Sequence, residues 1–157
     1  MQKQIHSIKI NVFEKNQDEI ETINQVYQYL LPLDFKKEKI NILQEQLEGF
    51  NQKIIYSITL ETIKKRHNMM LVEVIFGNLE KNEIKKIYDQ IESRLSDDGS
   101  FYMRLDKQSL LDKSFILTED GDCFHIKIKT AGYPAKRQIF ITTIKKILEK
   151  YKELREL

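Results

Sequence analysis

The stretch DDGSFYMRLDKQSLL, residues 97–111, has the pattern of a strand that carries polar chemistry on one side. Its apolar side chains occupy every second position, which places them on one face of a strand. These apolar residues are Phe101, Met103 and Leu105. The opposite face carries Tyr102, Arg104 and Asp106, and Lys107 follows directly. We therefore expect a half-buried strand whose other side presents an aromatic ring and charged groups.

A second stretch, CFHIKIKT at residues 123–130, repeats this arrangement. Its inward positions are Phe124, Ile126 and Ile128, and the residues between them are His125, Lys127 and Lys129. Antiparallel sheets commonly bury one face and leave the other in water, and this pattern is typical of such a sheet. The polar sides of the two strands form one surface if the strands are neighbours.

Three further segments have strand patterns. IHSIKINVFE, residues 5–14, alternates apolar and polar side chains. QEQLEG and KIIYSITLETI predict the two arms of a hairpin that turns at residues 49–52. The short apolar run 115–117 precedes an Asp120-Gly121 step, which predicts a hairpin with the 123–130 strand.

Four segments have the spacing of amphipathic helices. The first is expected to begin after Asn16, and the second covers residues 64–76. Asn78 is expected to cap the third, and the fourth is expected to begin at Pro134. This order predicts an α+β fold, in which a mostly antiparallel sheet has helices packed on one face.

Length and composition are consistent with that fold. The 157 residues contain no long linker or repeat, so we expect a single α+β domain over residues 1–157. Hydrophobic residues make up 41% of the chain and charged residues 32%, which is typical of a folded soluble protein. No run resembles a membrane span or a signal peptide, so we expect a cytoplasmic protein without a membrane partner.

Charge is unevenly distributed along the chain. The net charge is +2, but residues 123–157 contain nine basic and three acidic residues and so carry +6. The remainder of the chain therefore carries −4. A basic end on an acidic body can steer a polyanion to one surface, although a solvated Lys/Glu helix gives the same pattern.

Several motifs carry a resemblance to a known family. DDGSFYMRLDKQ, AGYPAKR, the IHSIKINVF strand and the EGF-N-KII hairpin resemble an archaeal family of small predicted RNA-binding proteins, which are described as exosome-subunit-like. The similarity extends over nearly the whole chain in order. It implies a fold like that of the large-subunit ribosomal protein that binds 5S RNA, with RNA as partner.

The two strands then supply a candidate RNA-binding surface. Aromatic rings that stack on bases and basic groups that bind phosphates are the usual means of holding single-stranded RNA. The candidate residues are Tyr102, Arg104, Lys107, His125, Lys127 and Lys129. In the alternative interpretation, Arg104 and Asp106 form cross-strand ion pairs and Tyr102 only covers the sheet.

TAGYPAKR, residues 130–137, is a second candidate site. Basic residues in the first turn of a helix are unfavourable because that end of the helix dipole is already positive. Lys136 and Arg137 would be explained by a bound phosphate at the helix start. Alternatively, both side chains extend back to acidic groups on the body of the protein.

Catalytic patterns are absent from the sequence, and we expect a non-enzyme. His6, His67 and His125 lack metal-ligand spacing, so we expect no metal and no cofactor. The lone Cys123 has no activating partner nearby in the sequence, so we expect it to be a small buried apolar residue.

Two classes of function remain open. The first is a non-catalytic RNA-binding protein. It would be an accessory to RNA processing or exosome-like RNA degradation, or to ribosome-related work, and its partner could be a multi-subunit RNA-processing complex. The second is a protein-interaction or self-assembling subunit that uses the open sheet face or an edge strand, as a homo-oligomer for example. Phe13, Ile55 and Ile141 favour the second because they fall off the expected core face.

Overall fold

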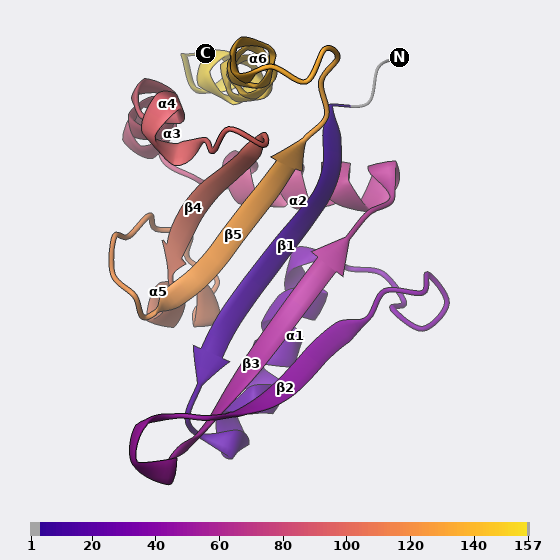
Figure 1. The fold of residues 1–157 in the computed structure, drawn as a ribbon, viewed down its shortest axis with the longest axis vertical. Coiled ribbons are helices and arrows are strands. Elements are labelled where there is room, and N and C mark those ends of the chain that lie inside the picture. The colour runs from indigo at the N-terminus through magenta and orange to yellow at the C-terminus, as the bar shows by residue number, and fades with distance from the viewer. Residues whose placement is uncertain (1–3, 157) are drawn as a thin grey trace.

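Five strands form one antiparallel sheet in the order β2-β3-β1-β5-β4 (Figure 1). The computed structural model describes the backbone of residues 4–156 and the side chains of residues 4–153. The strands are β1 (Ile5–Glu14), β2 (Ile42–Glu48), β3 (Ile54–Thr62), β4 (Ser100–Asp106) and β5 (Cys123–Thr130). The first strand of the chain is central, so it meets partners from both halves of the sequence.

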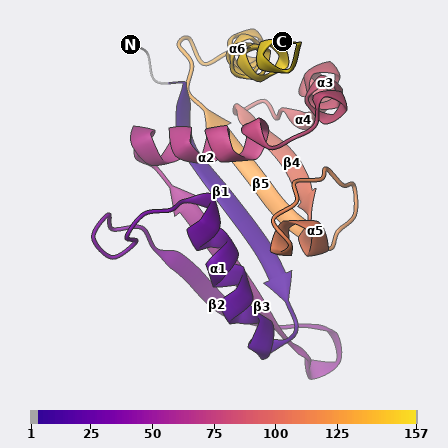
Figure 2. The same ribbon diagram turned by 180° about the vertical axis from the view of Figure 1, so that it is seen from behind.

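The helices leave one face of the sheet uncovered. They are α1 (Ile20–Leu30), α2 (Lys65–Gly77), α3 (Lys81–Asp89), α4 (Ile91–Arg94), α5 (Lys107–Leu111) and α6 (Arg137–Glu156). Two short 3-10 turns, η1 (Gln17–Glu19) and η2 (Phe50–Gln52), complete the elements. Figure 2 shows α1 and α2 lying across the back of the sheet, while α3, α4 and α6 gather at one end. The predicted α+β fold, an antiparallel sheet with helices on one face, is confirmed.

The core lies between the sheet and the helices. Alternate residues along most of the inner strands are buried there, such as Ile8, Ile10 and Val12 of β1, as the sequence alternation predicted. At its centre the Tyr27 hydroxyl of α1 donates to the backbone carbonyl oxygens of Ile58, at 2.7 Å, and Ile10, at 3.1 Å. The Phe124 ring packs edge-on against Tyr27, with centroids 6.0 Å apart. These contacts join α1 to three adjacent strands from behind.

Residues 97–111 do not form one continuous strand. β4 ends at Asp106, whose carboxylate accepts from the backbone N–H of Ser109 at 3.0 Å and from its hydroxyl at 2.6 Å. Asp106 is therefore the N-cap of α5, and its side chain accepts a hydrogen bond from a backbone N–H that has no partner within the helix. Hydrogen bonds from Ser109 lower the pKa of the Asp106 carboxyl, which keeps this cap ionised.

The predicted hairpin between 115–117 and the 123–130 strand is wrong. Instead, this segment lies along the other side of β4, where Leu117 bridges Leu105. The Asp106 N–H donates to the Ile116 carbonyl at 2.8 Å, and the Thr118 N–H donates to the Arg104 carbonyl at 3.1 Å. The segment thus protects the outer edge of β4, which the local sequence could not indicate.

Three smaller expectations also need correction. The third helix begins at Lys81 with Glu80 as its N-cap, so Asn78 does not cap it. The last helix begins at Arg137, three residues after Pro134. Ile141 is 5% exposed and belongs to the core, so it does not support an interface.

Candidate nucleic-acid interface

The uncovered face of the sheet, called the open face below, presents side chains that the strand register arranges in rows (Figure 1). On β4 and β5 its members are the predicted Tyr102, Arg104, His125, Lys127 and Lys129. On β1 they are Lys9, Asn11 and Phe13. Five of the predicted site residues therefore share one surface.

One row runs across four strands as Tyr102, Lys127, Lys9 and Glu61. The Tyr102 side chain is 46% exposed, so its ring is open to a ligand. Lys127 forms no ion pair with any side chain that the structure describes. Lys9 has its Nζ 3.6 Å from a Glu61 carboxylate oxygen, a loose and solvated pair. An exposed ring beside a free cation is suited to stacking on a base and neutralising its phosphate.

The next row places Arg104 beside His125 and Asn11. The Arg104 guanidinium donates one hydrogen bond, at 3.0 Å, to the backbone carbonyl of Glu119. No acidic side chain in the described part of the chain forms an ion pair with it. The alternative, in which Arg104 and Asp106 take part in cross-strand ion pairs, is therefore not formed among the described side chains. The remaining Arg104 donors are available to a ligand.

Asn11 and Phe13 complete the β1 part of the open face. The Asn11 side-chain amide donates to the Thr59 hydroxyl at 2.7 Å and to the Ser57 hydroxyl at 2.8 Å. Phe13 packs edge-on against the His125 ring, with centroids 6.2 Å apart. Asn11 and His125 are thus held in place by neighbours on adjacent strands before any ligand binds.

The open face is electrically divided. Its basic members lie on β1, β5 and β4: Lys9, Arg104, Lys127 and Lys129. On the β3 and β2 side the same face carries Glu61 and Glu45. A polyanion is attracted to the first part and repelled by the second, so the β1, β5 and β4 part is the candidate interface.

His125 lies at the middle of this interface in its neutral form. Burial is the main cause that lowers the pKa of His125 below its ordinary 6.5, and the nearby Arg104 charge adds to it. At neutral pH this ring therefore offers a flat surface and a hydrogen bond rather than a positive charge.

We predict that an NMR titration of the folded protein will place the His125 midpoint below 6.5. Arg104→Ala is expected to raise that midpoint, because a like charge that opposes protonation is removed while burial stays. Lys9→Ala is the control and should leave it unchanged. A midpoint that does not respond to Arg104→Ala would show that the two side chains are not neighbours.

Lys107 is separated from the other candidates by a structural role. Its Nζ lies 2.9 Å from a Glu14 carboxylate oxygen and donates to the Phe13 carbonyl at 3.0 Å. The side chains of Lys107 and Glu14 are both only 12% exposed. Burial alone would raise the pKa of Glu14, but the hydrogen bonds from Lys107 and Asn16 and the Lys107 charge outweigh it and lower the pKa. Lys107 therefore ties α5 to the end of β1.

Lys136 and Arg137 lie at the start of α6, away from the rows of the open face. The Arg137 guanidinium donates to the backbone carbonyls of Leu95, at 2.8 Å, and Glu92, and lies 3.4 Å from an Asp97 oxygen. This geometry favours the alternative in which Arg137 extends back to the body of the protein. Lys136 is exposed.

Residues 7–130 match a protein family described as RNA binding. The chain belongs to this RNA-binding family. The match runs from β1 to the last residue of β5 and so includes the whole candidate interface.

One curated relative and two solved structures are similar to this chain over nearly its whole length. RNA-binding protein PAB1135 of Pyrococcus abyssi (strain GE5 / Orsay) is 24% identical over 146 residues, which cover 93% of this chain and 95% of the relative. Mth689, a DUF54 protein from Methanothermobacter thermautotrophicus, is 25% identical with a TM-score of 0.73, over 92% of this chain and 98% of its own. SSO0741 from Sulfolobus solfataricus has the same fold, with a TM-score of 0.72 at 17% identity over 95% and 98% of the two chains.

The resemblance to an archaeal RNA-binding family is thereby confirmed. The link to an exosome and the likeness to the 5S-RNA-binding ribosomal protein stay predictions.

Two further observations concern metal ions and membranes. Among the described side chains, no three His, Cys, Asp or Glu residues gather in a group that could hold a metal ion. None of the described helices is long and apolar enough to pass through a membrane.

Proposed function

We propose that this protein is a non-catalytic RNA-binding module that holds single-stranded RNA on the β1, β5 and β4 part of the open face. The observation that supports this most strongly is the row in which Tyr102 lies beside Lys127, with Lys9 next in line. Stacking on an exposed ring and neutralisation of phosphates by cations do not depend on the base sequence, so we expect broad sequence tolerance.

The neighbours of His125, in the row beside that of Tyr102 and Lys127, support a binding role over an enzymatic one. His125 has an aromatic ring and a guanidinium as neighbours on the face, and neither is a nucleophile that it could activate. A module that binds without cleaving suits an accessory to RNA processing or degradation, which presents RNA to a catalytic partner. Exosome-related or ribosome-related work are the two settings we propose for it.

Fluorescence-anisotropy titrations of an internally labelled single strand and of the matching duplex test this proposal at two salt concentrations. We expect the single strand to bind more tightly, because paired bases cannot stack on Tyr102. Its affinity should fall as salt rises, with a log–log slope of about −0.7 for each phosphate neutralised. Equal affinity for strand and duplex, or no binding at low salt, would contradict it.

A second candidate function follows from the opposite edge of the sheet. β2 is exposed along its length and has β3 as its only strand partner among the described residues. Leu43, Leu47 and Phe50 of this hairpin are 56%, 41% and 92% exposed. A free strand edge with apolar side chains can pair with another chain, so this edge is where we place self-assembly or a protein partner. Light scattering across a concentration series separates a monomer from an assembling subunit.

A further inference from the structure

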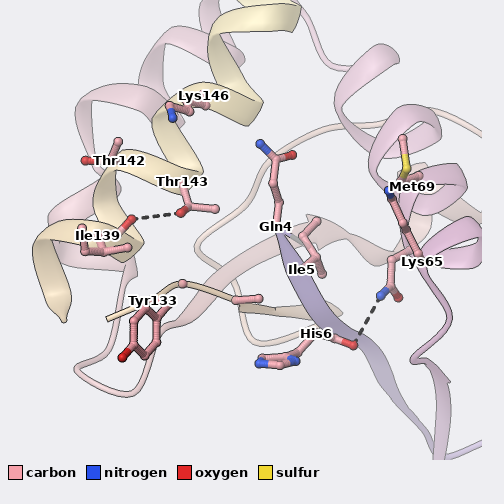
Figure 3. A pocket seen from close by; sticks show the side chains of 13 residues that line it. Gln4, Ile5, His6, Lys65, Met69, Tyr133, Ile139, Thr142, Thr143 and Lys146 are labelled. Atoms are coloured by element: carbon pink, nitrogen blue, oxygen red, sulfur yellow. Dashed lines mark hydrogen bonds between the residues drawn. The ribbon is translucent and has the colours of Figure 1, made fainter. Parts of the chain in front are cut away.

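A pocket of about 790 Å³ lies at the end of the sheet where β1 begins (Figure 3). Four segments far apart in the sequence line it: the start of β1, the first turn of α2, the 131–133 connection and the first half of α6. Its size lies within the roughly 300–1,000 Å³ that small-molecule pockets have. The predicted TAGYPAKR site overlaps it at Ala131, Gly132 and Tyr133, but Lys136 and Arg137 do not line it.

The lining is basic without any compensating acid. Lys65 of α2 and Lys146 of α6 enter from two different helices, and His6 comes from β1 (Figure 3). None of the thirteen lining residues is acidic. Neither lysine forms an ion pair with a described side chain. Two free cations around one hollow are favourable only if an anion or water lies between them.

The start of α2 adds to this positive character. Its N-cap, Lys64, makes no side-chain capping bond, and no acidic residue lies in the first turn. In that turn Arg66 forms an ion pair with Glu38 at 2.6 Å, and the His67 Nε2 lies 3.6 Å from the other Glu38 carboxylate oxygen. Lys65 is the basic residue of this turn that lines the pocket, together with Asn68. An uncapped helix start beside a free lysine attracts an anionic group such as phosphate.

Apolar surface at the same pocket is suited to a base. Tyr133 is 92% exposed and Met69 is 57% exposed, and both line the pocket. Tyr133 follows by three residues the end of β5, the strand on which Lys127 and Lys129 form a column of the open face. A strand of RNA that passes along this column reaches the pocket at its end.

We propose that this pocket binds the terminal nucleotide of an RNA strand that carries a phosphate at that end. Lys65 and Lys146 bind the phosphate, and Tyr133 stacks on the base. The inference rests on the proposed function, because the rest of the strand lies on the open face. The same chemistry is found in a free nucleoside monophosphate, which the experiment treats as a separate arm.

Isothermal titration calorimetry compares one unlabelled RNA decamer in three forms: with a 5′-phosphate, with a 3′-phosphate and with neither. We expect one phosphorylated form to bind about fivefold more tightly, the scale of a few partly exposed charge contacts. The Lys65→Ala/Lys146→Ala variant should lose this preference and still bind the form without phosphate. The Lys36→Ala/Lys85→Ala variant removes the same charge from exposed sites outside the pocket and should keep the preference.

The outcomes separate the pocket from the open face. Equal binding of the three decamers by the unmodified protein, or an equal loss in both double variants, would overturn the pocket proposal while leaving the open face untouched. If no decamer binds, the proposed function fails, and titration with 5′- and 3′-adenosine monophosphate then tests the pocket alone. Binding of either nucleotide that is lost with Lys65→Ala/Lys146→Ala supports it, and no binding overturns it.

Discussion

Replacing Tyr102 and Lys127 together by alanine is expected to weaken the binding of single-stranded RNA by about thirtyfold, or about 2 kcal/mol. The two residues are direct cross-strand neighbours, one with an exposed ring and the other with an unpaired ammonium group. A base that stacks on the ring and its phosphate would lose both contacts at once. Anisotropy titration at low salt measures the change.

The control for this variant is a matched pair on the helix side. Tyr29 is 37% exposed, and the Lys113 Nζ lies 4.9 Å from the centroid of its ring. Tyr29→Ala/Lys113→Ala removes the same two side-chain types, so general charge and aromatic content change equally. We expect RNA affinity to stay within about twofold in the control. An equal loss in both variants would mean that RNA has no preference for the open face.

The second large effect concerns the core behind that face. Phe124→Ala is expected to lower the free energy of unfolding by about 3–5 kcal/mol, because a fully buried ring leaves a cavity against Tyr27. Phe124 and His125 are adjacent on β5 and point to opposite faces, so the strand that carries RNA contacts is fixed from behind by this ring. Urea unfolding followed by circular dichroism measures the loss.

Phe50→Ala is the matched control for this substitution. Phe50 is 92% exposed at the β2 and β3 turn, so its removal should change the free energy of unfolding by less than about 0.5 kcal/mol. If Phe124→Ala changed the free energy of unfolding equally little, this would contradict the packing of the Phe124 ring against Tyr27 of α1.

Much of the open face could be predicted because it depends on alternation within single strands. The two-residue period in 5–14, 100–106 and 123–130 separates inward from outward side chains without knowledge of the fold. Strand order is a long-range property, however, and nothing local indicated that β1 lies between β3 and β5. Lys9 and Asn11 were visible as polar positions, but their place beside Lys127 and His125 was not.

Local competition and distant contacts explain the features that the sequence did not indicate. Asp106 had the spacing of a cap, with Ser109 three residues on, yet strand alternation suggested that it belonged to the polar face. Lys107 was grouped with RNA-binding residues because its partner Glu14 is distant in the sequence. The sequence indicated only the 130–137 part of the pocket, since Lys65, Tyr133 and Lys146 come together only when α2 and α6 reach the same end of the sheet.

The most direct test of the central claim is an NMR titration of isotope-labelled protein with an unlabelled single-stranded RNA. We predict that the largest shifts of backbone amide signals fall on the basic part of the open face: Lys9, Asn11, Tyr102, Arg104, His125 and Lys127. The backbone amide signals of α1 and α3, which lie away from that face, should not shift (Figures 1 and 2). Shifts that concentrate on β2 or on α1 and α3, with β1, β5 and β4 unaffected, would contradict the account.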